Sequence, residues 1–278
     1  MRILVTNDDG IDSVGLHVLA RAMRRHGDVV IVAPDREYSG ASAAFGALHL
    51  IQPEVHHANV EGIETAWTVS GPPALCVMFA RLGAFEGPFD LVVSGINPGA
   101  NVGRSVYHSG TIGAALTARN GGIPGVAVSQ AVSGFGIEGQ GWDEMLVGQQ
   151  WDTAAAVADA VVAGLLADGP VEPVVININV PNVALTDIVG WRRAVVGHEP
   201  PRAMARVTLE PKEGHAGSYY ARMSWGDALE LPAHTDGGAV ERGEVAITYL
   251  NRLQHDHDHD TQPVPTKAEL ALDALLRG

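Results

Sequence analysis

The stretch that decides the fold is residues 2–10, with the sequence Arg-Ile-Leu-Val-Thr-Asn-Asp-Asp-Gly. A short Val/Ile/Leu run bounded by turn residues is typical of a strand buried on both faces. Asp8 and Asp9 follow it directly, and adjacent carboxylates repel each other unless a divalent cation or a shared proton offsets their charge. Asn, Asp and Gly are also common turn residues. On its own, this segment therefore predicts either a plain turn or a metal site.

Similar apolar runs recur along the first two thirds of the chain, and they predict further buried strands at residues 29–33, 91–94, 126–129 and 174–180. Helical patterns alternate with these runs, at residues 16–23, 114–120 and 152–168. Glycines follow each helical pattern, as expected at helix ends. Strands that alternate with helices predict an α/β fold with a doubly wound, mostly parallel sheet.

The pattern of residue types in the sequence changes from about residue 181. Helical patterns become rare, and residues 207–210 and 245–249 look like isolated strands. We therefore divide the chain into a core over residues 1–180 and a C-terminal extension over residues 181–278. The extension is expected to contain a β-hairpin and a short terminal helix over residues 266–277.

Composition narrows the class of protein. The 278 residues suit one large domain, or a domain with an appendage. Cys76 is the single cysteine, so no intramolecular disulfide can form and a reducing cytoplasm is the expected location. The first residues lack the apolar segment of a signal peptide, and no run of 18 apolar residues occurs, so we expect no membrane partner.

The formal charge of −14 argues against binding to a nucleic-acid polymer or an anionic membrane. Such surfaces are bound by clustered Lys and Arg. An acidic protein can still bind one small phosphate group if a local cation reverses the sign of the charge.

Three polar loops are expected to meet at one edge of the sheet, at residues 7–10, 34–42 and 95–103. Each follows a predicted parallel strand, and ligands of such sheets bind outside the carboxyl ends of the strands. The loops offer carboxylates, hydroxyls and amide oxygens. Oxygen donors without thiolate or imidazole favour Mg²⁺, Mn²⁺ or Ca²⁺ over Zn²⁺. Together the loops predict a hard-cation site that could also hold a substrate phosphate.

A fourth polar segment, Ser109-Gly110-Thr111, opens a helical pattern. The free N–H groups at a helix N-terminus can bind phosphate, although Ser or Thr there can equally be a plain cap. His108 precedes the segment and is either a proton donor to the leaving group or, the interpretation we favour, a polar residue in the wall of the site.

Several long motifs in order resemble one family. They are ILVTNDDGIDSVGL from residue 3, VVIVAPDREYSGAS from residue 29, DLVVSGINPGANVG from residue 90, SGTIGAAL from residue 109 and HTDGGAVERGEVAITYL from residue 234. The chain resembles the SurE, or survival protein E, family of metal-dependent nucleotidases. The resemblance implies a Rossmann-like core and a C-terminal extension that joins homodimers or homotetramers, often by exchange of a hairpin.

The resemblance also implies an activity and a ligand set. The expected reaction releases phosphate from nucleoside 5′-monophosphates, with 3′-monophosphates and short polyphosphate as further substrates. The expected cofactor is one Mg²⁺ or Mn²⁺ per subunit. The positions that match the family's metal ligands are Asp8, Asp9, Ser39 and Asn97.

Our hypothesis for the reaction is attack by a water molecule that the metal positions. Asp8 or Asp9 would also orient this water. The backbone amides of Gly110 and Thr111, with Ser109, would bind the phosphate oxygens, and Asn101 would add a donor. A covalent aspartyl-phosphate is the competing route.

The sequence departs from the family pattern in a few places. Leu75 stands where the family has an acidic residue before the cysteine, and residues 49–66 and 133–150 match poorly, so we expect loops there that could set substrate choice. A His-Asp repeat at residues 255–260 is interpreted as a solvated loop or hairpin edge, with a soft-metal site as the alternative. Cys76 is expected to be a buried apolar residue and not a nucleophile.

Three other functions remain to be weighed. One is a nucleotide- or metal-binding module with the same fold and no catalysis. A nicotinamide-dependent oxidoreductase is disfavoured because the first turn lacks G-x-G-x-x-G and places acids where a pyrophosphate would bind. A haloacid-dehalogenase-type phosphatase is disfavoured because that class separates its two aspartates by one residue, whereas Asp8 and Asp9 are adjacent.

Overall fold

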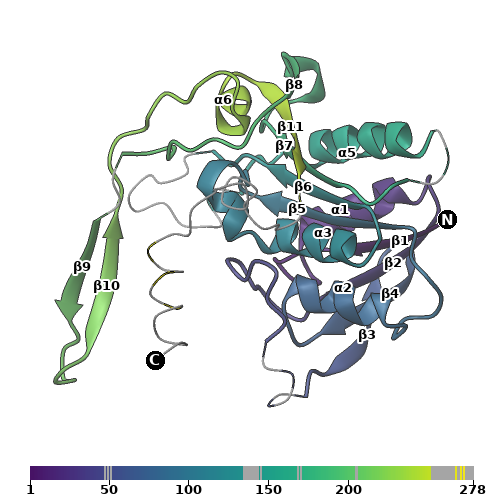
Figure 1. The fold of residues 1–278 in the computed structure, drawn as a ribbon, viewed down its shortest axis with the longest axis horizontal. Coiled ribbons are helices and arrows are strands. Elements are labelled where there is room, and N and C mark those ends of the chain that lie inside the picture. The colour runs from purple at the N-terminus through teal and green to yellow at the C-terminus, as the bar shows by residue number, and fades with distance from the viewer. Residues whose placement is uncertain are drawn as a thin grey trace.

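A nine-stranded mixed sheet forms the centre of the protein in the computed structural model (Figure 1). The structure describes residues 1–46, 48, 50, 52–133, 144, 146–167, 169, 171–203, 206–251, 267, 270 and 272. The predicted loop at residues 133–150 is thus described only in part. The repeat at residues 255–260 lies outside the described residues. So does the terminal helix predicted over residues 266–277, apart from Lys267, Leu270 and Leu272.

The strand order is β3-β4-β2-β1-β5-β6-β7-β11-β8. The strands are β1 (Arg2–Thr6), β2 (Asp28–Pro34), β3 (Val55–Val60), β4 (Ile63–Val69), β5 (Leu91–Pro98), β6 (Gly125–Gln130), β7 (Val175–Val180), β8 (Gly190–Arg193) and β11 (Glu244–Leu250). The pairings from β4 through β7 are all parallel, and only β3–β4 and β7–β11 are antiparallel. The predicted α/β fold with a mostly parallel, doubly wound sheet is confirmed.

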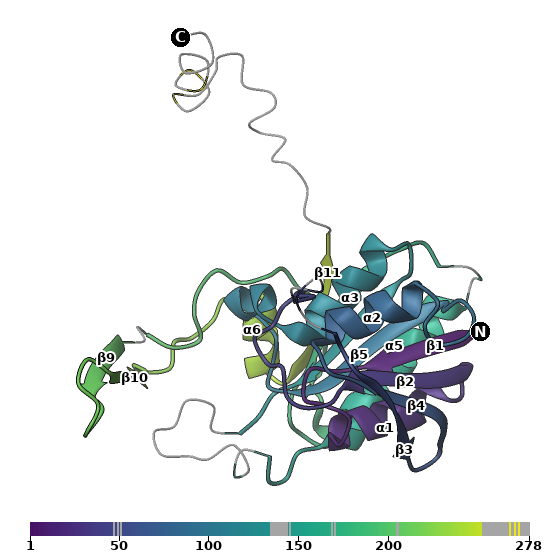
Figure 2. The same cartoon turned by 90° about the horizontal axis from the view of Figure 1, so that it is seen from below.

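Helices cover both faces of this sheet (Figures 1 and 2). The helical elements are α1 (Val14–Met23), α2 (Pro73–Arg81), η1 (Gly103–Tyr107), α3 (Gly110–Asn120), α5 (Trp151–Leu166), η2 (Leu185–Asp187) and α6 (Asp236–Glu241). Alternate residues of β1 enter two different cores. Ile3 and Val5 pack in a core with residues of α1 and α5, whereas Leu4 packs with residues of α2 and α3. This is why Ile3, Leu4 and Val5, in the middle of the first strand, are all apolar.

Two strands occupy much of the segment at residues 49–66, in which we expected loops. β3 and β4 form an antiparallel pair at the edge of the sheet, and α2 follows them. Most of β3 is exposed, including His56 and His57. An exposed edge strand needs no apolar face, so it gives little of the alternating pattern that predicts strands. Leu75, the departure from the family pattern, is fully buried in α2.

The C-terminal third contributes to the main sheet and also projects from it. The prediction that residues 245–249 form an isolated strand is wrong, because β11 pairs with β7 on one side and β8 on the other. The strand predicted at residues 207–210 belongs to a separate hairpin of β9 (Arg206–Pro211) and β10 (Tyr219–Ser224). The hairpin stands away from the sheet in both views (Figures 1 and 2). Within the described ranges, no helix is long and apolar enough to cross a membrane.

Candidate metal and phosphate site

The order of the strands brings the three polar loops to one edge of the sheet. β1 lies between β2 and β5 and is parallel to both, so the segments that follow these strands emerge side by side. Backbone hydrogen bonds tie the first two loops together. The N–H of Tyr38 donates to the carbonyl of Asp8 at 2.7 Å, and that of Ile11 donates to the carbonyl of Pro34 at 2.9 Å. The predicted convergence of these loops is therefore present in the fold.

Asp8 is bound by the N-terminus of α3. Its side chain is buried, with Oδ2 accepting from the Gly110 N–H at 3.1 Å and Oδ1 accepting from the Thr111 hydroxyl at 2.5 Å. The partial positive charge at a helix N-terminus favours such a carboxylate. Burial nevertheless raises the pKa of Asp8, and the hydrogen bond from Thr111 opposes that rise. Asp8 is thus a fixed group whose orientation α3 determines.

Asp9 is held less completely than Asp8. Its Oδ2 is buried and accepts no hydrogen bond from any residue that the structure describes. Burial, followed by the charges of Asp8 and Glu37, raises the pKa of Asp9 to about 8. A carboxyl group in this environment favours either a proton or a nearby cation. The charge of the adjacent acids is therefore offset either by a proton on Asp9 or by a cation.

Asn7 provides a second unmatched acceptor beside the acids. Its amide Nδ2 donates to the carbonyl of Gly10 at 3.0 Å, whereas its Oδ1 is buried and has no partner among the described residues. Buried polar atoms normally have a hydrogen-bond partner, and each exception calls for an explanation. Unmatched oxygens on Asn7 and Asp9, next to a second carboxylate, fit a hard cation such as Mg²⁺ or Mn²⁺.

Asn97 lies at an irregularity in β5. Ser94 pairs with Ala127, but Asn97 pairs with Ser129, so three steps along β5 match two along β6. Such a bulge redirects side chains and is common beside functional sites. The Asn97 amide Nδ2 donates to the carbonyl of Gly99 at 2.7 Å. This bond engages the amide nitrogen, and the role of Asn97 Oδ1 as a metal ligand stays a prediction.

Ser39 lies on the loop after β2 and is exposed. The loop is anchored on both sides of it, by the Tyr38–Asp8 bond and by the Ser42 N–H, which donates to the carbonyl of His108 at 3.1 Å. No hydrogen bond in the described part of the chain joins the Ser39 hydroxyl to an aspartate. The structure places Ser39 at the correct edge of the sheet, and its role as a ligand stays a prediction.

The groups that we predicted to bind phosphate form hydrogen bonds with other residues of the chain. The Ser109 hydroxyl caps α3 by accepting from the Ile112 N–H at 3.1 Å. The Gly110 N–H and the Thr111 hydroxyl are directed at Asp8. His108 is exposed, which does not suit a residue packed in the wall. The segment is therefore seen to position Asp8, and its contact with a phosphate stays a prediction.

Asn101 is the centre of a buried polar network that we did not predict. Its Nδ2 donates to the Ser129 hydroxyl at 2.9 Å, and its N–H donates to Oδ1 of Asn179 at 2.7 Å. Its carbonyl accepts from the side chains of both Asn177 and Asn179. The two asparagines alternate within an otherwise apolar strand, and that alternation was a usable signal in the sequence. The network fixes the loop after β5.

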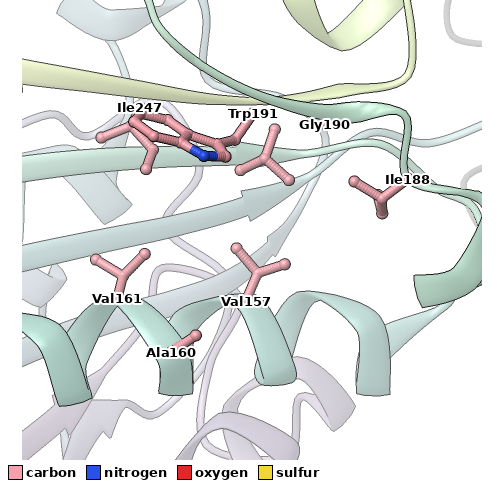
Figure 3. Close-up of a pocket in the computed structure, with 8 residues that line it drawn as sticks. Val157, Ala160, Val161, Ile188, Gly190, Trp191 and Ile247 are labelled. Atoms are coloured by element: carbon pink, nitrogen blue, oxygen red, sulfur yellow. The ribbon is translucent and has the colours of Figure 1, made fainter.

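An apolar cavity of about 400 Å³ lies elsewhere, between α5 and the β8–β11 end of the sheet (Figure 3). It is lined by Val157, Ala160, Val161, Ile188, Gly190, Trp191, Val245 and Ile247. The only polar side-chain atom among these residues is the indole nitrogen of Trp191. This lining offers no oxygen donors, so the cavity is unsuited to a hard cation or a phosphate group.

Comparisons with known proteins agree on one family. The family model described as survival protein SurE matches residues 3–202. The chain is 36% identical to the 5′-nucleotidase SurE of Marinomonas sp. (strain MWYL1), over 90% of this chain and 92% of that protein. It is 37% identical to the 5′-nucleotidase SurE of Xanthomonas axonopodis pv. citri (strain 306), over 90% of each. The crystal structure of the SurE protein from Aquifex aeolicus has a similar fold, with a TM-score of 0.74 and 29% identity over 93% of this chain and 96% of that one.

Proposed function

The chain belongs to the survival protein SurE family, and we propose that it is a metal-dependent phosphomonoesterase that hydrolyses nucleoside 5′-monophosphates to nucleoside and phosphate. The observation that carries this proposal is the pair Asp8 and Asp9, with the unmatched oxygens of Asp9 and Asn7, at the ligand-binding edge of the sheet. Relatives named 5′-nucleotidase support the substrate class. Nucleoside 3′-monophosphates and short polyphosphate are proposed as further substrates.

The proposed cofactor is one Mg²⁺ or Mn²⁺ per subunit, held by oxygens of Asp8, Asp9, Ser39 and Asn97. Two carboxylates balance the charge of one divalent ion, and the serine and asparagine oxygens add ligands without adding charge. The cation would also offset electrostatic repulsion, since a protein with a formal charge of −14 would otherwise repel a phosphate. When bound, the cation supplies Lewis acidity to the phosphoryl group.

The residues around the proposed cation have separate roles in the proposed reaction. Gly110 and Thr111 hold Asp8 in one orientation. Asp9 keeps a buried oxygen that accepts no hydrogen bond from the described part of the chain, and we therefore assign to Asp9 the orientation of the attacking water. Asn101, held through the carbonyl and N–H of its backbone, fixes the loop that carries Asn97. The alternative is a covalent aspartyl-phosphate intermediate. Phosphate trapped on the protein during turnover would support this intermediate and exclude direct attack by water.

A phosphate-release assay tests the proposal. Purified protein is incubated with a panel of nucleoside 5′- and 3′-monophosphates and with Mg²⁺, Mn²⁺ or EDTA. We expect metal-dependent release that EDTA abolishes, and a loss on the order of a hundred-fold or more in Asp8→Asn and Asp9→Asn. Asp12→Asn is the matched control, because Asp12 is an exposed acid a few residues along the same segment and should keep the wild-type rate. Folded, metal-loaded protein that binds nucleotides without releasing phosphate would instead identify the non-catalytic module.

We further propose that the protein is a homodimer or homotetramer joined through the β9–β10 hairpin. The pairing register places Val207, Leu209, Tyr219 and Met223 on one face of the hairpin, and all four are at least half exposed. The opposite face carries the ion pair of Arg222 with Glu210, at 2.9 Å. A lone two-stranded hairpin with an uncovered apolar face is only marginally stable, which supports its burial against another copy. The single, buried Cys76 supports a cytoplasmic location.

A further inference from the structure

Asp236 is a fully buried acid that lies outside the proposed ligand set. It is the first residue of α6, in the C-terminal part of the chain. Its two oxygens accept three backbone N–H groups. Oδ1 accepts from Gly197 at 3.0 Å and from Gly237 at 2.9 Å, and Oδ2 accepts from Gly103 at 3.0 Å. One carboxylate thus joins three segments that are distant in the sequence.

The contact with Gly103 connects Asp236 to the proposed site. Gly103 begins η1, which lies between the Asn97 loop and the N-terminus of α3. Its φ of +55° is a left-handed conformation that favours glycine, and a Cβ there would lie 3.3 Å from the carbonyl of Gly197. The two segments therefore meet backbone to backbone, with Asp236 bonded to both.

Other hydrogen bonds fix the part of this loop that precedes Gly103, between Asn97 and Asn101. Asn97 bonds to the carbonyl of Gly99, and the Gly99 N–H donates to the carbonyl of Gln130 at 2.7 Å. Asn101 is held by β6 and β7. Asp236 supplies the next anchor along the chain, through a side chain of the C-terminal third, and Arg104 adds a second link to that third by donating to the carbonyl of His198 at 3.0 Å. Beyond it, the chain turns through η1 into Ser109 and α3.

We infer that Asp236 is a positioning residue for the proposed phosphatase, coupling the C-terminal part of the chain to the loop between Asn97 and α3. The inference rests on the proposed function, and its structural part stands on the three hydrogen bonds. A carboxylate suits this position because it only accepts hydrogen bonds, whereas an asparagine would present its NH₂ group to at least one N–H donor. Loss of the Gly103 bond would release the loop on which Asn97 and the start of α3 depend.

The experiment compares Asp236→Asn with Glu244→Gln, a control that breaks another polar link of the C-terminal part. Glu244 pairs with Arg192 between β11 and β8, at 2.7 Å. In the folded Asp236→Asn protein we expect faster amide hydrogen exchange over residues 97–109, a Mn²⁺ dissociation constant raised about ten-fold and a kcat lowered about ten-fold. Glu244→Gln should leave all three at wild-type values. Wild-type exchange and Mn²⁺ affinity in Asp236→Asn would overturn the inference.

A measurement on the wild-type protein covers the case in which Asp236→Asn fails to fold. The amides of Gly103 and Gly197 should exchange at least about ten-fold more slowly than that of the neighbouring exposed Arg104, because only the first two donate to the buried carboxylate. Unprotected amides at Gly103 and Gly197 would refute the inference. Absence of phosphate release by the wild-type protein would refute the proposed function instead, and would leave the exchange result unaffected.

Discussion

The adjacent acids at the end of β1 have different surroundings, although they are neighbours in the sequence. Asp8 is held by two hydrogen bonds from α3, while a buried oxygen of Asp9 has none within the described ranges. This asymmetry suggests a division of labour, with Asp8 as the fixed ligand and Asp9 as the group that can respond to a proton, a water molecule or a cation. Two sets of predictions at the scale of single residues follow from it, one for Asp9 and one for Asp8.

The first concerns the pH dependence of metal binding. A pKa of about 8 means that Asp9 holds a proton in the metal-free protein at neutral pH, and a cation must displace it. We expect the affinity for Mn²⁺ to rise about ten-fold per pH unit up to about pH 8 and then to level off. Calorimetric titrations between pH 6 and 9 measure this slope. A flat profile between pH 6 and 8 would contradict it.

The same shift fixes the sign of a stability effect. The folded, metal-free protein keeps a proton on Asp9 that the unfolded chain loses near its ordinary pKa of about 4. The free energy of unfolding of the metal-free protein should therefore fall as the pH rises from about 4 to about 8. Urea unfolding across this range measures the trend. Asp9→Asn should reduce its slope, because it removes the titrating group.

The second prediction concerns the support of Asp8. Thr111→Val removes the 2.5 Å hydrogen bond to Asp8 with little change in shape. A hydrogen bond to a charged group contributes about 1.5–3 kcal/mol, so we expect kcat to fall by about ten-fold or more. Thr117→Val is the matched control, because Thr117 is a buried hydroxyl of the same helix that bonds only to the carbonyl of Gly113. Steady-state kinetics of the two variants should separate them, and equal rates would contradict the assigned role of Thr111.

At the scale of elements, close contact with α3 shapes the site. A Cβ at Gly110 would lie 2.8 Å from the Cβ of Asp8, and one at Gly113 would lie 2.1 Å from the carbonyl oxygen of Ser42. Neither distance is compatible with a side chain. The small residues at the start of α3 therefore let the helix approach both the acid pair and the loop that carries Ser39.

This packing gives a prediction at the same scale. Gly113→Ala should push the loop at residues 39–42 away from α3, lower the stability by about 1–3 kcal/mol and weaken Mn²⁺ binding. Gly164→Ala is the control, since Gly164 lies in α5 with open space around it. That change should raise the stability by up to about 1 kcal/mol through helix propensity. Urea unfolding and Mn²⁺ titration of both variants give the comparison, and a neutral Gly113→Ala would show that the contact does not matter.

At the scale of the whole molecule, the main sheet and the hairpin have different roles. The sheet holds the proposed site, whereas the hairpin extends an exposed apolar face away from it (Figure 1). The proposed site draws on both ends of the chain, since Asp8 lies near the N-terminus and the proposed positioning residue Asp236 lies in the C-terminal part.

The corresponding prediction concerns assembly. Leu209→Glu places a charge on the apolar face of the hairpin and should convert the oligomer to smaller species, as measured by analytical ultracentrifugation. Thr208→Glu, on the polar face opposite Arg222, is the control and should leave the assembly intact. A wild-type protein that sediments as a monomer, or a Leu209→Glu variant with unchanged mass, would contradict the proposed interface.

Local sequence patterns predicted the central part of the fold because β1, β2, β5, β6 and β7 are buried at nearly every position and are rich in Val, Ile, Leu and Ala. They failed for β3, whose exposed edge position removes the apolar pattern. They predicted the strand β11 but not its place in the main sheet, since pairing with β7 depends on residues far away in the sequence. The roles of Asp236 and Asn179 were equally out of reach, because their partners lie in distant segments.

The class of fold, the edge of the sheet at which the polar loops meet, and the oxygen-donor chemistry of the acid pair could all be predicted from the amino-acid sequence alone. These properties follow from local hydrophobicity, strand order and residue type. The folded chain was needed to show that α3 binds Asp8, that an oxygen of Asp9 has no partner among the described residues, and that Asp236 reaches the loop after β5. Hydrogen bonds between distant segments depend on how the elements pack, and packing is a property of the whole chain.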